Sequence, residues 1–246
     1  MQSIVRAFAL LEAMSQAPGE IGIAQLAKRA GLHVSTTHRL LATLVALGYA
    51  RQSPETGRYA VGARALQLAE AYGEQTDLRG AARPVLERLS RETGETANLV
   101  VLEGHEALYV DKAESAQNLR IFSRIGRRTP LYCTAVGKVL LAWRPPDEVR
   151  RLLAATPIER LTRRTITDAQ RLTRELLRVR QQGYALDLEE CEEGARCIAT
   201  PVRVASGEVV AAISLSGPSI RMHSGRLREL IPMMLAAAAE VSGQLG

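Results

Sequence analysis

The turn at Gly31 constrains the fold of this chain more than any other feature, because it joins two short helical segments. Residues 23–30 carry apolar side chains on one helical face, and Gly31 can adopt the positive φ angle that ends a helix. Small Ala27 stands four residues before the glycine, and Leu32 and Leu40 follow it. This spacing allows two helices to pack closely across a tight turn and predicts a helix-turn-helix.

Helices are expected on both sides of this turn. Apolar residues recur at helical spacing over residues 3–16, which predicts a first helix that ends before Pro18. A third helix is expected over residues 35–47, with Ser35 as its N-cap and Gly48 after its last turn. The inner stripe of this helix is expected to consist of Leu40, Leu41, Leu44 and Leu47.

A β-hairpin is expected directly after the third helix. Residues 49–53 and 58–61 are two β-rich runs, and the sequence Pro-Glu-Thr-Gly between them favours a turn. Three helices followed by a hairpin make a winged helix-turn-helix, which we assign to residues 1–62.

The outward face of the third helix predicts DNA binding. With the leucines inward, small polar groups and an arginine point outward, and Arg39 can pair bidentately with guanine. The wing arginines can reach the backbone or the minor groove. The candidate DNA contacts are Ser35, Thr36, His38, Arg39, Thr43, Arg51 and Arg58. The alternative is a winged helix used only for protein contacts, and His38 could equally be an exposed residue without a contact.

Composition limits the other function classes. The formal net charge is +6, but residues 1–75 contribute only a small part of it, so the charge itself is weak support for DNA binding. The chain has only three cysteines, and an odd number cannot all pair, so a secreted disulfide framework is not expected. No uncharged run is long enough to span a bilayer, and no export signal is present. We expect a soluble cytoplasmic protein that does not interact with membranes.

A second, larger domain follows a connector. Residues 63–77 are expected to form a linker helix, and a further helix is expected over residues 78–92. Strands are expected at 97–103, 107–111, 119–123, 184–188, 195–203 and 209–216, and helices at 135–143, 146–154, 168–182 and 224–245. This order predicts an α+β domain with a mostly antiparallel sheet.

Four segments together resemble the IclR family of bacterial transcriptional regulators over essentially the whole chain. They are LAKRAGLHVSTTHRLLATL at 26–44, GRYAVG at 57–62, TPLYCTAVGK at 129–138 and DLEECEEGARCIATPV at 187–202. The resemblance implies a DNA-binding domain, a linker helix and a GAF/PAS-like effector-binding and oligomerisation domain over residues 78–246. It also implies homodimers that often pair into tetramers on palindromic DNA operators.

The resemblance further implies an effector site on the inner face of the sheet. The matching positions are Leu131, Ala135, Val136, Asp187, Cys197, Ser214 and Ser216. Backbone N–H groups of residues 135–137 can hold an anion at a helix N-terminus, and the two serines share one face of a strand, so a small carboxylate is the expected effector. Asp187 would accept a hydroxyl from the ligand, and either Ile121 or Phe122, but not both, would supply an apolar wall.

Other interpretations of these residues stay open. Ser214, Ser216 and Cys197 could be satisfied core residues without a ligand, and the chain could be an architectural DNA-binding protein. A thiol-based enzyme would use Cys133, Cys191 or Cys197 with a histidine, but no nucleophile elbow or phosphate loop is present, so no enzyme is expected. The acidic loop around Cys191 lacks zinc spacing, so neither a metal nor a cofactor is expected.

Overall fold

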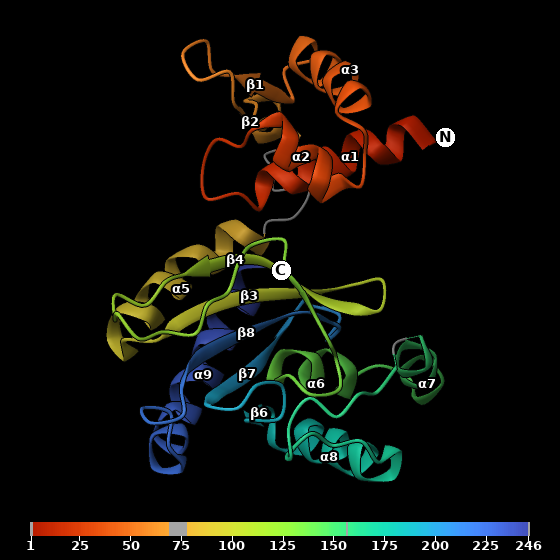
Figure 1. The fold of residues 1–246 in the computed structure, drawn as a ribbon. Coiled ribbons are helices and arrows are strands. Elements are labelled where there is room, and N and C mark those ends of the chain that lie inside the picture. The colour runs from red at the N-terminus through yellow and green to blue at the C-terminus, as the bar shows by residue number, and fades with distance from the viewer. Residues whose placement is uncertain (1, 69–77, 156, 246) are drawn as a thin grey trace. The chain divides into compact units, whose positions relative to one another are not determined.

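The computed structural model describes residues 2–68, 78–155 and 157–245, and the chain divides into two units, Met1–Thr76 and Asp77–Gly246 (Figure 1). Over residues 2–62, the first unit contains three helices and a two-stranded antiparallel sheet. Its elements are α1 (Gln2–Ser15), α2 (Ile23–Ala30), α3 (Val34–Ala46), β1 (Ala50–Gln52) and β2 (Tyr59–Val61). This is the predicted winged helix-turn-helix.

The turn between α2 and α3 has the predicted geometry. Gly31 adopts a φ of 64°, and the N–H of Leu32 donates to the carbonyl oxygen of Ala27 at 2.9 Å. Ala27 is buried, as are Leu26 and Leu41 on the two facing helices. A small side chain at Ala27 therefore allows α2 and α3 to share one core with α1.

Two details of α3 differ from the prediction. His33, not Ser35, is the N-cap residue, because its backbone is extended and its carbonyl oxygen already accepts from the N–H of Thr37. The helix therefore begins earlier, and Thr37 joins Leu41 and Leu44 on the buried face. Leu47 is 53% exposed, since it caps the end of the helix and no longer follows the inner stripe.

The predicted linker helix lies only partly within the described residues. Residues 64–68 are helical, and residues 69–77 lie outside the described part of the chain. None of the helices in the described part is both long and apolar enough to cross a lipid bilayer.

The second unit is built on one six-stranded sheet of order β5-β4-β3-β8-β7-β6, in which every described pair of neighbours is antiparallel. Its strands are β3 (Thr96–Glu103), β4 (Glu106–Ala113), β5 (Arg128–Thr129), β6 (Ala185–Leu188), β7 (Ala195–Arg203) and β8 (Val209–Pro218). Its helices are α5 (Leu78–Thr93), α6 (Ala135–Ala142), α7 (Pro146–Ala154), α8 (Ala169–Gln182) and α9 (Ser224–Gln244). The unit is α+β, as predicted.

Helices cover both faces of the sheet (Figure 1). One core joins the sheet to α5 and α9, with residues such as Leu86, Ile213 and Met234. The other core joins it to α6 and α8, with residues such as Val139 and Leu172. Because both faces are covered, the central strand β8 is buried over most of its length.

The predicted strand at residues 119–123 is absent, and β5 is the short segment Arg128–Thr129 instead. Leu119 and Phe122 are exposed, so this segment has no continuous buried face that would hold it in a sheet. It is held by single contacts, since the Ser123 hydroxyl donates to Asn98 Oδ1 at 2.7 Å and Lys112 Nζ donates to the Ser123 carbonyl at 2.7 Å.

Gly137 in α6 is required by close backbone packing. A Cβ atom at this position would lie 2.3 Å from the carbonyl oxygen of Leu131 and 2.4 Å from its Cα. These are backbone atoms in the buried segment that leads into α6, so they cannot move away as a flexible side chain would.

We therefore expect Gly137→Ala to destabilise the second unit by about 1–3 kcal/mol, because the added methyl forces α6 away from Leu131. Urea unfolding followed by the fluorescence of Trp143, the only tryptophan, measures this effect. Gly80→Ala is the matched control, since a Cβ there meets nothing within 4 Å. Equal unfolding midpoints for the two variants would contradict the close contact.

Candidate functional sites

The predicted DNA-contact residues of α3 lie on one outward face. Ser35, His38, Arg39 and Thr43 are exposed, and Thr36 is half-buried. The opposite face of the helix carries the buried residues of the core, so the polar face is held outward by packing and not by its own contacts. The arrangement presents a guanidinium, an imidazole and hydroxyls side by side, which suits hydrogen bonding in a major groove.

The two wing arginines differ in their surroundings. Arg51 Nη1 forms an ion pair with Glu20 Oε1 at 3.1 Å, and the Thr56 hydroxyl donates to the other oxygen of Glu20 at 2.9 Å. Arg58 is exposed, and its guanidinium has no ion pair among the described residues. An exposed ion pair is worth about 0–1 kcal/mol, so Arg51 remains able to exchange Glu20 for a phosphate.

A small cavity of about 50 Å³ lies in the second unit between the sheet and the N-terminus of α6. Six of the seven predicted effector residues line it: Ala135, Val136, Asp187, Cys197, Ser214 and Ser216. Leu131 does not line the cavity. Its side chain is buried in the core beside α6, and its backbone lies against Gly137.

The serines of β8 share the cavity face, as predicted, and they share a partner that sequence analysis missed. Asn98 Nδ2 donates to Ser214 Oγ at 3.3 Å and to Ser216 Oγ at 3.0 Å, and Asn98 is fully buried on the neighbouring strand β3. Each serine oxygen thus accepts from the amide, which leaves its hydroxyl proton to be donated into the cavity.

The N-terminus of α6 is only partly open to an anion. Thr134 is its N-cap, and the Thr134 hydroxyl oxygen accepts from the N–H of Gly137 at 3.1 Å. The expected anion site therefore loses the Gly137 donor. The N–H groups of Ala135 and Val136, which both line the cavity, are the first-turn donors that remain.

Asp187 is held in the cavity wall with a perturbed acidity. The N–H of Glu190 donates to Asp187 Oδ1 at 2.7 Å, and the carboxyl group is 2% exposed. Burial raises the pKa of Asp187 to about 7, against the opposing effects of the Glu190 hydrogen bond and the positive charge of Lys138. Near neutral pH this group can therefore accept a hydrogen bond or donate one.

A buried ion pair stands behind the cavity. Lys138 of α6 is fully buried, and its Nζ lies 2.6 Å from Oε1 of Glu190, in the turn after β6. The only sequence signal for it is one lysine in the apolar run of α6. The pair holds the turn that follows Asp187 and β6 against the helix that carries Ala135 and Val136.

The remaining walls contain several residues that sequence analysis did not assign. Tyr109, Ser123, Arg127, Thr129, Thr134, Cys191, Glu192 and Ala195 line the cavity. Arg127 is the one cation among the described lining residues, and its Nη1 donates to the carbonyl of Phe122 at 3.2 Å. Both Ile121 and Phe122 line the cavity, in contrast to the prediction that only one could, because their segment is not a strand.

The three cysteines do not form a catalytic arrangement. Burial raises the pKa of the Cys197 thiol, and a hydrogen bond with Cys191 raises the pKa of Cys133 while that of Cys191 is lowered. All four histidines lie outside the residues that line the cavity, so no imidazole lines it together with Cys191 and Cys197. Among the described residues, no group of three or more His, Cys, Asp or Glu side chains is placed to hold a metal ion.

Comparison with known proteins gives matches over both units. Residues 70–243 match the profile described as bacterial transcriptional regulator IclR C-terminal, and residues 3–54 match the IclR helix-turn-helix domain. The chain is 42% identical to the HTH-type transcriptional regulator KdgR of Escherichia coli K12, with 100% of the chain and 93% of that protein covered.

Solved structures agree with the sequence matches. The IclR structure of Thermotoga maritima has a TM-score of 0.85 at 30% identity and covers 100% of this chain and 99% of that one. An IclR homologue of Microbacterium hydrocarbonoxydans in complex with 4-hydroxybenzoate has a TM-score of 0.84 at 26% identity, with 99% and 98% covered. The fold and both units are thus shared with full-length regulators.

The raised pKa of Asp187 predicts a pH-dependent stability. The unfolded carboxyl ionises near pH 4 while the folded one stays protonated until about pH 7, so stability is fully present below pH 4 and is lost as the pH rises through 7. Asp187→Asn is expected to raise the free energy of unfolding by on the order of 1–3 kcal/mol at pH 8 and by little at pH 4.

Urea unfolding at these two pH values, followed by Trp143 fluorescence, measures the difference. Asp147→Asn on α7 is the control, because that carboxylate is exposed and should give no such pH dependence. A stabilisation by Asp187→Asn that is equal at both pH values would rule out the raised pKa as its cause.

Proposed function

Because the chain belongs to the IclR family of bacterial transcriptional regulators, we propose that it binds a palindromic operator as a homodimer or a tetramer and that a small organic acid in its second unit changes this binding. The family consists of DNA-binding regulators with a ligand-binding C-terminal domain, so the thiol-based enzyme is excluded. Its place of action is the cytoplasm, where the bacterial chromosome lies.

The cavity carries the proposal of a carboxylate effector. Hydrogen-bond donors converge on it from β8 and from the first turn of α6, and Arg127 adds a positive charge. Donors and a cation favour a carboxylate. Two carboxyl groups, Asp187 and Glu192, also line the cavity, and the raised pKa of Asp187 limits its negative charge below about pH 7. A homologue with the same fold is known in complex with 4-hydroxybenzoate, which is an organic acid.

Entry of the effector requires movement of the cavity wall. The cavity measures about 50 Å³, far below the roughly 300–1,000 Å³ of typical ligand sites. The wall formed by residues 121–127 lies outside the regular strands. Backbone hydrogen bonds to Tyr109 of β4 hold its end at Gly126 and Arg127, whereas residues 121–125 are held mainly at Ser123. We propose that this segment moves outward to admit the acid and that its arginine then contacts the carboxylate.

Operator binding as a dimer is supported by an apolar surface on the first unit. Ile4, Val5 and Phe8 on the outer side of α1 are exposed. Ile4 and Phe8 line an apolar groove of about 590 Å³ that also contains Leu40 and Leu47. Two of the predicted DNA contacts, Arg39 and Thr43, line the same groove. A second copy of this chain is the proposed occupant, because a palindromic operator needs two recognition helices related by two-fold symmetry.

Coupling between effector and operator is proposed to run through residues 63–77. An effector can change DNA affinity only if it binds one arrangement of the dimer better than another. Rotation of the linker helices would change the separation of the two α3 helices. Repression and activation both fit this scheme, since they depend on where the operator lies relative to a promoter.

The effector proposal predicts a thermal shift. Small aliphatic, sugar and aromatic acids are screened, and at least one is expected to raise Tm by mass action. Ser214→Ala and Ser216→Ala should each weaken its binding roughly tenfold or more, because a hydrogen bond to a charged group is worth about 1.5–3 kcal/mol. Ser206→Ala, in the turn between β7 and β8, is the control. If both cavity variants bound the acid with unchanged affinity, the effector site would lie elsewhere in the protein.

The DNA proposal predicts a loss of sequence discrimination. An operator is first selected from a pool of random duplexes, and binding is followed by fluorescence anisotropy at fixed salt. Arg39→Ala should weaken operator binding by about 1–3 kcal/mol and leave non-specific binding nearly unchanged, because base contacts carry the specificity. Arg151→Ala on α7 controls for the lost charge. If Arg39→Ala lowered the affinity for operator and for random DNA equally, Arg39 would contact a phosphate and not a base.

A further inference from the structure

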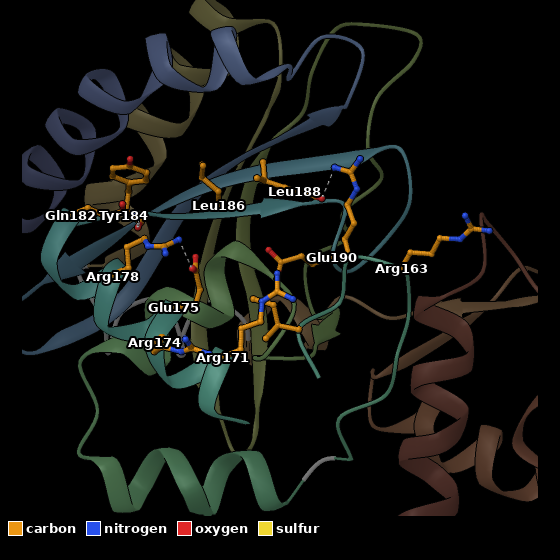
Figure 2. A pocket seen from close by; sticks show the side chains of 12 residues that line it. Arg163, Arg171, Arg174, Glu175, Arg178, Gln182, Tyr184, Leu186, Leu188 and Glu190 are labelled. Atoms are coloured by element: carbon orange, nitrogen blue, oxygen red, sulfur yellow. Dashed lines mark hydrogen bonds and ion pairs between the residues drawn. The ribbon is translucent and has the colours of Figure 1, made fainter. Parts of the chain in front are cut away.

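A second concave surface lies outside the effector cavity, along α8 and the edge strand β6 (Figure 2). This groove has a volume of about 740 Å³, within the range of roughly 300–1,000 Å³ that is typical of small-molecule sites. Its walls are strongly basic and include Arg163, Arg164, Arg171, Arg174 and Arg178. None of these residues belongs to the DNA-binding surface or to the effector cavity.

The groove holds more positive charge than its own acidic groups neutralise. Arg171, Arg174 and Arg178 follow one another at spacings of three and four residues, so α8 presents them along one face. Arg178 pairs with Glu175 at 3.2 Å, whereas Arg171 and Arg174 have no ion pair among the described residues. Across the groove, Arg164 lies 3.6 Å from Glu189. An anion is the ligand that such a surface favours.

One buried acceptor in the groove lacks a partner. Glu190 is only 7% exposed, and its Oε1 accepts from Lys138 Nζ at 2.6 Å. Its Oε2 is buried and has no hydrogen-bond partner among the described residues. A buried acceptor left unpaired is destabilising, and more so when it is charged. An anion alone cannot satisfy this oxygen, which requires a donor.

We propose that the groove binds a hydroxylated organic anion, such as a phosphorylated sugar acid. Its anionic group pairs with Arg171 and Arg174, and one of its hydroxyls donates to Glu190 Oε2, which a rotation of the carboxylate must first expose. Tyr184, Leu186 and Leu188 of the β6 side supply apolar surface for the carbon chain (Figure 2). A small molecule fits better than a nucleic acid strand, because the unpaired acceptor is buried and a phosphate backbone offers it no donor.

The groove is distinct from the effector cavity but adjoins it through one turn. Glu190 lines the groove, and its N–H donates to Asp187, which lines the cavity. The two sites therefore have different lining arginines and share a single structural element. Binding in the groove does not depend on the effector proposal, and substitutions can separate the two.

Isothermal titration of the full-length protein with 6-phosphogluconate tests the proposal. Gluconate and inorganic phosphate are titrated in parallel, because each carries only part of the expected chemistry. We expect 6-phosphogluconate to bind at least tenfold more tightly than either. The double variant Arg171→Gln with Arg174→Gln should lose at least tenfold in affinity, and the matched pair Arg151→Gln with Arg228→Gln, which removes two exposed charges on α7 and α9, should not.

A second variant tests the buried acceptor. Glu190→Gln keeps an oxygen for Lys138 but removes the carboxylate, so affinity for 6-phosphogluconate should fall while that for phosphate stays the same. Circular dichroism checks that the variant is folded. Ser214→Ala in the effector cavity should leave groove binding unchanged. The proposal is overturned if no probe binds at millimolar concentration, or if binding survives the α8 double variant.

Discussion

The buried ion pair between Lys138 and Glu190 is the contact on which the functional part of the second unit depends. A fully buried ammonium without its partner costs several kcal/mol, so the fold cannot form with α6 and the β6–β7 turn apart. α6 brings the open N–H groups and the end of β6 brings Asp187, so this pair joins two elements that line the cavity. The same carboxylate forms part of the arginine-lined groove. One electrostatic contact thus lies between two separate concave surfaces.

The cavity combines a rigid polar side with a loosely held one. Asn98, Ser214 and Ser216 form a hydrogen-bonded set across two paired central strands, and such a buried set keeps its geometry because every change leaves an unpaired group. The opposite wall, residues 121–127, is not a strand, and its backbone hydrogen bonds to β4 are confined to Gly126 and Arg127. A site with this asymmetry can hold fixed donors ready for a ligand while its other wall adapts.

Local signals predicted most of the fold, and long-range contacts account for what they missed. The turn at Gly31 and the hairpin after α3 follow from residues a few positions apart, and both were predicted correctly. The false strand at 119–123 had β-forming residues but no partner strand, which a local pattern does not reveal. Asn98 and the Lys138–Glu190 pair join residues 116 and 52 positions from their partners. The candidate effector residues came from the family resemblance, since buried serines alone are ordinary core residues.

The irregular wall of the cavity has a consequence for how such a regulator could change over generations. Substitutions at Asn98, Ser214 or Ser216 disturb the central strands. Each is therefore expected to lower the free energy of unfolding, whether or not it allows a new ligand to bind. Substitutions at Ile121 or Phe122 alter the lining without touching the ladder of the sheet. New ligand specificities would therefore be acquired most readily through this segment, while the polar side on β3 and β8 is inherited unchanged.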